Sequence, residues 1–453
     1  MFSSGFFLPC LWGREKHGIL FQYTERRGIM AKGKRWFKLD NAGKLYPAIS
    51  TSRWSSIFRI SAELHEMVDP LLLQKAADAV MPRFPSFQVR MKSGLFWYYL
   101  EEIKEPLSVQ PDVGHPCMPF RFRQNHGYLM RICYYRNRIS AEFFHALTDG
   151  SGGLCFIKTL TAEYLRLKGI KIPCEKGVLD PKETPSPGEI REAFTALPLP
   201  KVRISRKEAP SFHFPATPEL PHTLHTISAS MPCDVLRALA KKHGVTLTEY
   251  LAGAILFAAF RQQEMRPEKK KRPIRISIPV NLRSFFPSPT LRNFSSFLNP
   301  GIDPRLGSYT FPEVLREVHA FMGYHLNPRF LLGAVATNVA DEKNLFTRLA
   351  PLFLKNLVIS SVFRQAGDRL VCATLSNLGL CAFPDAMAPF IRRFEFQLGV
   401  PSSPLCNCAA LTTGNELRLL FSSNIRETAL PRELLRFLVE EGVPVTVESN
   451  LED

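Results

Sequence analysis

The hydrophobic period of the chain changes on either side of residues 143–153. Before this stretch, apolar and polar residues alternate over 139–144, the period of two that is typical of a β-strand. After it, apolar residues recur at three- and four-residue spacing over 154–165, and Gly169 offers a helix stop. The pattern therefore predicts a strand, a glycine-rich turn and a helix, with His145 at the end of the strand.

The elements around this stretch predict an α/β lobe over residues 41–170. They are a strand at 57–62, a helix that starts at Pro70 with Asp69 as its N-cap, strands around 87–92 and 95–100, and a hairpin of 129–135 and 139–144. Residues 171–222 hold ten prolines in 52 positions and few apolar runs, which predicts a crossover or linker. Residues 1–40 are largely polar, basic and aperiodic, so we expect a disordered extension there.

Residues 223–453 predict a second lobe of similar kind. The expected elements are strands at 223–231, 275–280, 371–375, 408–412 and 416–422, and helices at 234–243, 250–263, 311–322, 345–363 and 431–440. The helix at 345–363 is interpreted as a core helix, with docking on a lipid surface as the alternative. The fold class is therefore α/β, with mixed sheets and helices in two lobes.

Composition narrows the class of protein. The chain of 453 residues has a formal charge of +17, but its basic residues are scattered apart from the run 269–272, so we expect a solvated loop and no nucleic-acid partner. The longest apolar run, 251–260, is too short to span a bilayer. Ten cysteines without a CxxC pair indicate reduced thiols, no metal site and a cytoplasmic location.

The chemistry available at the strand end centres on His145. A neutral imidazole accepts a proton from a hydroxyl, an amine or a thiol near neutral pH. Gly150, Gly152 and Gly153 permit unusual backbone dihedrals and let a ligand approach the backbone. The alternative is a polar histidine that only satisfies a structural hydrogen bond, and the spacing alone does not decide between the two.

The run from His145 to Gly150 resembles the His-x-x-x-Asp-Gly motif of the acyl-CoA-dependent acyltransferase superfamily. This group includes chloramphenicol acetyltransferase, plant acyltransferases, peptide-synthetase condensation domains and bacterial alcohol acetyltransferases. The resemblance implies that His145 is the general base and that Asp149 organises the site by turning towards an arginine. It also implies two chloramphenicol-acetyltransferase-like lobes, with the active site in a tunnel between them.

Two later segments match the same superfamily. Arg283 and Asn293 match the arginine that pairs with the motif aspartate and the asparagine that follows it. The run Ser376-Asn377-Leu378-Gly379 is similar to a turn near the tunnel of bacterial alcohol acetyltransferases, so Ser376 and Asn377 are candidates for lining the tunnel or for binding the oxyanion. A single histidine at the motif, and the lack of the plant enzymes' Asp-Phe-Gly-Trp-Gly, favour the alcohol-acetyltransferase-like branch.

The resemblance implies transfer of an acyl group, most simply acetyl, from acyl-CoA to an alcohol hydroxyl. No bound cofactor and no metal are expected, and acyl-CoA acts as a cosubstrate. The expected partners are a small alcohol and acyl-CoA, for a monomer with at most weak peripheral membrane contact. Two alternatives stay open: a condensation-type enzyme that forms amides or esters from a carrier-bound donor, and a binding protein without catalysis.

We predict that residues 1–29 are dispensable. Their polar, aperiodic character leaves little apolar area to bury, so ordering them would cost more conformational entropy than it returns. A chain that starts at Met30 should stay soluble and keep its turnover. Loss of either property in a direct comparison with the full chain would refute this expectation.

Overall fold

The computed structural model describes residues 35–451 except 51–55, 113, 121–124, 203, 205–207, 221, 267–269, 344–348, 367 and 401–405. The segment whose removal is predicted to be harmless, 1–29, lies outside the described residues and stays a prediction. Within the described part, the α/β class with two lobes and mixed sheets is confirmed.

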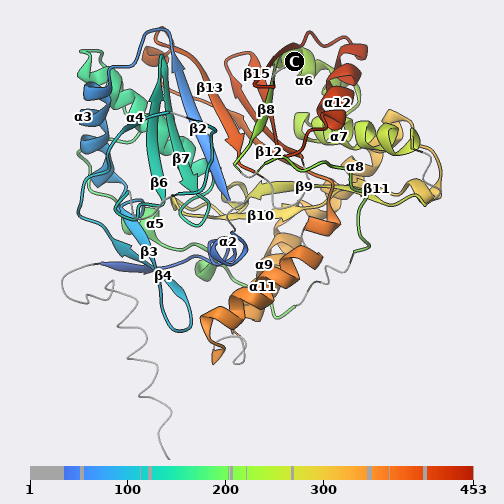
Figure 1. Ribbon diagram of the computed structural model, residues 1–453, viewed down its shortest axis with the longest axis horizontal. Helices are drawn as coiled ribbons and strands as arrows, with labels where there is room; N and C mark the ends of the chain where they lie inside the picture. The colour runs from blue at the N-terminus through green and yellow to red at the C-terminus, as the bar shows by residue number, and fades with distance from the viewer. Residues whose placement is uncertain are drawn as a thin grey trace, which may run out of the picture.

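The first lobe contains a sheet in the strand order β13-β2-β7-β6-β5, which Figure 1 shows on the left. Its strands are β13 (Ile391–Leu398), β2 (Ile57–Leu64), β7 (Arg138–Phe144), β6 (Met130–Tyr135) and β5 (Gln110–Pro111). Helices α3 (Pro70–Val80) and α4 (Gly150–Leu167) pack together beside it, and α4 contacts β2 and β7. Below it lies a small sheet of β1 (Trp36–Lys38), β4 (Tyr98–Glu102) and β3 (Val89–Ser93), in that order.

The second lobe is built on a mixed sheet in the order β10-β9-β12-β14-β15-β8-β16, with β11 also paired to β9. Its strands are β8 (His225–Pro232), β9 (Ile274–Asn281), β10 (Ser295–Leu298), β11 (Gly301–Ile302), β12 (Ala373–Leu380), β14 (Cys406–Thr413), β15 (Glu416–Ser423) and β16 (Thr446–Ser449). The pairs of β12 with β9 and with β14 are parallel, and the others are antiparallel.

The second lobe's main core helix is α7 (Leu247–Glu264), which is buried on most sides and starts at a capping box formed by Thr246 and Glu249. Around it lie α6 (Cys233–Lys242), α8 (Phe311–His325) and α12 (Ala429–Glu440). Among the described helices, none alone is long and apolar enough to cross a membrane. By length and composition α6 and α7 would qualify only as a pair, and they meet at 83°.

The remaining helices are α2 (Leu45–Ile49), α5 (Pro187–Ile190), α9 (Pro328–Lys343) and α11 (Leu352–Ala366). The sequence pattern predicts a single core helix over 345–363, but the structure starts α11 at Leu352 and leaves much of its apolar surface exposed. This part of the expectation is wrong, because alternating Phe, Leu and Val side chains look the same in a buried helix and in one whose apolar face points outwards.

Two boundaries of the expected domains also need correction. The range 1–40 was expected to lie outside the fold, but β1 pairs with β4, and the side chain of Asp40 is completely buried. The range 223–453 was expected to form the second lobe alone, yet β13 pairs with β2 in the first lobe's sheet. A strand that leaves its own lobe has no local sequence signal, because its pairing partner lies more than 300 residues away.

The glycines after His145 are helical, which corrects the expectation of unusual dihedrals. Gly150, Gly152 and Gly153 belong to the first turn of α4, and none is among the residues with positive φ. Gly152 instead permits close packing: a Cβ there would lie 2.2 Å from both the Leu291 carbonyl oxygen and the Thr148 hydroxyl.

We predict that Gly152→Ala destabilises the protein by about 1–3 kcal/mol, because the added methyl overlaps backbone that cannot move aside easily. Gly323→Ala is the matched control, since Gly323 lies in helix α8 with open space around its Cβ position. That control should raise stability by about 0.5–1 kcal/mol. Thermal unfolding of both variants checks the prediction, and equal melting temperatures for Gly152→Ala and wild type would contradict it.

Candidate active site

The turn that carries His145 is fixed at both ends. The backbone N–H of His145, one residue after β7, donates to the Ser56 carbonyl at 2.9 Å. Four residues later, Asp149 caps α4: its Oδ1 accepts from the backbone N–H groups of Ser151 and Gly152 at 3.1 and 3.2 Å. A carboxylate is a favourable N-cap because it satisfies orphan donors at the positive end of the helix.

The other carboxylate oxygen of Asp149 faces the second lobe. Its Oδ2 accepts from Arg283 Nη1 at 2.7 Å and from the backbone N–H of Phe294 at 2.8 Å. The expected ion pair between Asp149 and Arg283 is therefore confirmed, with both side chains largely buried. Because all these bonds go to the cap, the arginine and the backbone, Asp149 acts as an organiser of the turn in this geometry.

Arg283 also holds the loop that faces His145. It lies in the short helix η3 (Leu282–Ser284), just after β9, and donates to the carbonyl oxygens of Thr290 and Arg292. On the other side of the loop, the Thr148 hydroxyl donates to the Leu291 carbonyl at 2.6 Å. These bonds fix the backbone before Asn293, and the bond from the Phe294 N–H to Asp149 fixes it afterwards.

Asn293 contacts the imidazole directly. Its Nδ2 donates to the His145 carbonyl at 2.9 Å and lies 3.3 Å from Asp40 Oδ2, so its Oδ1 is left as an acceptor. That Oδ1 lies 3.1 Å from His145 Nδ1, which must therefore carry the ring proton. The lone pair of the neutral ring is on Nε2, the nitrogen that a base would use.

Asp40 completes this chain of contacts and was missed by the sequence reasoning. Its carboxylate also accepts from the Gly43 backbone N–H at 2.5 Å and lies 3.4 Å from Arg292 Nη2, in a pair that is almost fully buried. Burial raises the pKa of Asp40, while the Arg292 charge acts in the opposite direction. Asp40 precedes the first regular strand pattern, so no periodicity or motif pointed to it.

The imidazole is held between aromatic rings and is kept neutral. The Tyr46 ring, from α2, stacks on it with centroids 4.4 Å apart, and Phe58 contacts it edge-on at 5.1 Å. Burial lowers the pKa of His145 below its ordinary value of 6.5, although the nearby Asp149 charge and the Asn293 bond favour the protonated ring. The free base is therefore the main form at neutral pH.

The segment expected to form a turn at 376–379 is part of strand β12. Its Ser376 and Asn377 pair with β14, and the register shifts only after Asn377. Leu378 lies next to the His-x-x-x-Asp-Gly run, because its side chain occupies the space beside Gly150. Asn377 Nδ2 donates to Thr248 Oγ1 at 3.1 Å, and among the described residues neither Ser376 nor Asn377 forms a hydrogen bond with His145.

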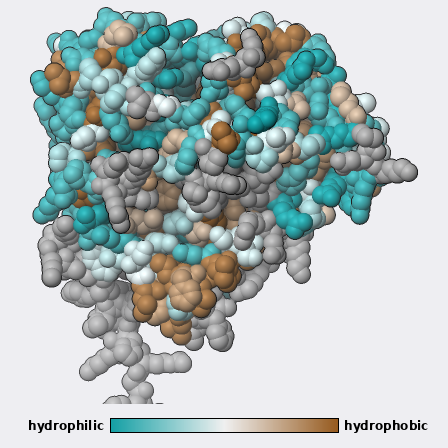
Figure 2. All heavy atoms as spheres, in the orientation of Figure 1, coloured by the Kyte–Doolittle hydropathy of each residue, from teal (hydrophilic) through white to brown (hydrophobic). Residues whose placement is uncertain are grey.

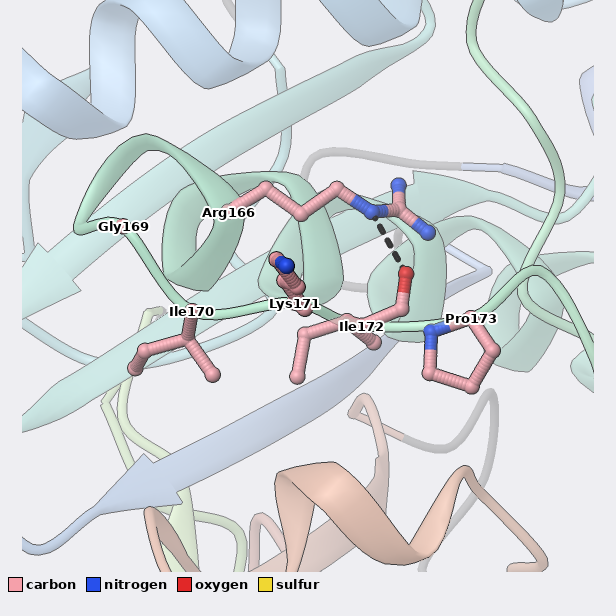
Figure 3. A pocket seen from close by; sticks show the side chains of 6 residues that line it. All are labelled: Arg166, Gly169, Ile170, Lys171, Ile172 and Pro173. Atoms are coloured by element: carbon pink, nitrogen blue, oxygen red, sulfur yellow. Dashed lines mark hydrogen bonds between the residues drawn. The ribbon is translucent and has the colours of Figure 1, made fainter.

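No metal centre is found within the described residues, where His, Cys, Asp and Glu form no group able to hold an ion. A surface cavity lies at the end of α4 and is lined by residues between Arg166 and Pro173 (Figure 3). The Arg166 side chain there donates a hydrogen bond to the Ile172 carbonyl. It does not include His145. The tunnel expected between the lobes stays a prediction.

Comparison with known proteins agrees with this architecture. Residues 224–295, which include Arg283 and Asn293, match the family described as phthiocerol/phthiodiolone dimycocerosyl transferase C-terminus. A trichothecene 15-O-acetyltransferase from Fusarium sporotrichioides superposes with a TM-score of 0.60 at 11% identity, over 91% of this chain and 96% of that one.

Two further solved structures match over similar lengths. Polyketide synthase associated protein 5 from Mycobacterium tuberculosis has a TM-score of 0.57 at 15% identity, over 89% of this chain and 96% of that one. The first condensation domain of the calcium-dependent antibiotic synthetase has a TM-score of 0.58 at 14% identity, with the same coverage.

The chain has the fold of condensation domains and acyltransferases. At these identities the likeness establishes the fold and not the reaction. No curated protein sequence matches the chain. Within this fold, His145 and Asp149 come from the first lobe and Arg283 and Asn293 from the second, so the site is assembled only where the lobes meet.

We predict that Asp149→Ala lowers the free energy of unfolding by about 3–5 kcal/mol, because it leaves Arg283 buried without its partner. Asp69→Ala is the matched control: Asp69 caps α3 in the same way but is exposed, so its loss should cost about 1 kcal/mol. Chemical denaturation measures both. If the two variants lose equal stability, the ion pair contributes nothing beyond the cap.

Proposed function

We propose that the protein is an acyl-CoA-dependent O-acyltransferase that moves an acyl group, most simply acetyl, to an alcohol hydroxyl, with His145 as the general base. One observation carries the proposal: Asn293 fixes the proton of His145 on Nδ1, and burial keeps the ring neutral. A base in this state accepts a proton on Nε2 near neutral pH. The partial family match and the acetyltransferase among the similar structures support acyl transfer as the reaction class.

The proposed reaction needs only this base and an electrophilic thioester. Nε2 of His145 takes the proton of the acceptor hydroxyl while the oxygen attacks the thioester carbonyl carbon. As the carbon–sulfur bond breaks, the proton passes to the leaving thiolate, so the products are an ester and free coenzyme A. Proton transfer of this kind contributes about 10²–10⁴-fold to the rate.

The developing oxyanion needs a hydrogen-bond donor. Ser376 and Asn377 remain the proposed candidates. The Asn377 amide gives one of its two N–H groups to Thr248, which leaves the second as a possible donor. The positive charge of the chain suits the phosphates of coenzyme A as a general attraction.

A condensation-type reaction is the second candidate, favoured by the condensation domains among the similar structures. It would use the same base but take its acyl group from a carrier protein and pass it to an amine or an alcohol. The two candidate reactions are distinguished by offering the same acyl group as a coenzyme A thioester and as a carrier-bound thioester. The donor that gives the faster turnover identifies the reaction class.

We predict that His145→Ala folds normally, still binds acyl-CoA and loses thiol release by about 10²–10⁴-fold. A base acts on the chemical step, so the binding of acyl-CoA should change little. Free thiol released from a panel of acyl-CoAs with alcohols and amines is the measurement. Equal rates for wild type and His145→Ala would show that the histidine is structural.

The pH dependence gives a second readout of the same prediction. Because burial lowers the pKa of His145, kcat/KM should rise as the ring loses its proton below pH 6.5 and be level at neutral pH. An inflection above 6.5 would mean that another group, or a charged imidazole, controls the reaction.

A further inference from the structure

Helix α11 exposes its apolar side chains instead of burying them. Phe353, Leu357, Val358 and Val362 are more than half exposed, with 71% for Phe353 and 66% for Leu357, and Leu354 is 43% exposed. The spacing of these residues places them on one side of the helix. Figure 2 shows hydrophobic side chains gathered at the lower end of the molecule, where Figure 1 places α11.

Three polar side chains of the same helix, Lys355, Asn356 and Ser360, bond to the body of the protein. Lys355 is almost fully buried and donates to the Phe96 carbonyl at 2.8 Å. Asn356 Nδ2 donates to the Tyr98 hydroxyl, and Ser360 donates to a carbonyl of α2, each at less than 3 Å. The usual arrangement of a surface helix is thus inverted, and these bonds hold the apolar face outwards.

The apolar surface continues onto the loop between β3 and β4. The Leu352 backbone N–H donates to the Leu95 carbonyl at 3.0 Å, and the Leu95 and Phe96 side chains are exposed beside the start of α11. At the base of this surface, the Trp97 ring lies 3.5 Å from Lys355 Nζ and 5.2 Å from Lys44 Nζ. Tryptophan is enriched among the side chains that lie at membrane–water interfaces.

The charge of the protein favours anionic lipid. Helix α11 carries no acidic residue, and the whole chain has a formal charge of +17. An apolar helix face on a basic protein is a pattern that binds bilayers with negative headgroups.

We propose that the exposed face of α11, together with Leu95 and Phe96, docks the protein on an anionic lipid bilayer. Helix α11 packs on α2, and Tyr46 of α2 stacks on His145, so docking would bring the candidate active site to the membrane surface. The docking itself does not depend on the proposed reaction. Its functional benefit rests on that reaction, because an active site held at a bilayer suits an acceptor or acyl chain that is itself lipid-soluble.

The test is flotation of the full chain with vesicles of phosphatidylcholine, with and without phosphatidylglycerol. Wild type should float with the anionic vesicles, and added salt should weaken binding by screening. Phe353→Ser and Leu357→Ser should each lower the partition coefficient about tenfold or more, because each removes an inserted apolar side chain. Both positions are exposed, so the melting temperature should not change.

Leu306→Ser is the matched control, since Leu306 is 82% exposed in the short helix η4 (Pro304–Leu306) and is not part of this surface. It should float like wild type. His145→Ala should also float like wild type, which separates this test from that of the reaction. Failure of wild type to float, or equal flotation of Leu357→Ser, would overturn the proposal. The proposal would also be overturned if the protein, in the absence of lipid, formed an oligomer or a complex with another protein that Leu357→Ser disrupts.

Discussion

The structure depends most on the carboxylate of Asp149. Its two oxygens receive four hydrogen bonds, two from the start of α4 in the first lobe and two from Arg283 and Phe294 in the second. The Asp149 side chain therefore caps helix α4, which follows His145 in the chain, and also links the two lobes close to His145. Because the carboxylate is buried, each of these bonds is made with a charged acceptor in a poorly solvated site, where such bonds are strongest. The position of His145 relative to Asn293 follows from these four hydrogen bonds.

Much of the site was predictable because its signals are local. The change of period around residues 143–153 located the strand and the helix, and the motif resemblance named Asp149 and Arg283 as partners. Asp40 was missed because it precedes any periodic segment and reaches the site only in the folded protein, where it contacts Asn293 and Arg292. The residues Ser, Asn and Gly at 376–379 predict a turn, but Ser376 and Asn377 stay paired with β14, and the backbone is irregular only at the register shift after them, where Gly379 has a φ of 75°.

The direction in which a helix faces was not predictable from its composition. The segment that became α11 has the side chains of a core helix, and only the bonds of Lys355, Asn356 and Ser360 to the protein body show that its apolar side is outside. The same limit applies to the glycines of α4. Their number suggested unusual backbone dihedrals, but the constraint at Gly152 is the close approach of the Leu291 carbonyl, which belongs to the other lobe.

The path of β13 bears on how the chain can be assembled as it leaves the ribosome. The chain passes from β12 in the second lobe to β13 in the first and back to β14 in the second. Until residue 398 has been synthesised, β2 has an open edge with no partner on that side. The first lobe therefore cannot complete its sheet until most of the second lobe has been synthesised. A nascent chain with such an unpaired strand edge is prone to aggregation, so we expect it to bind chaperones during synthesis.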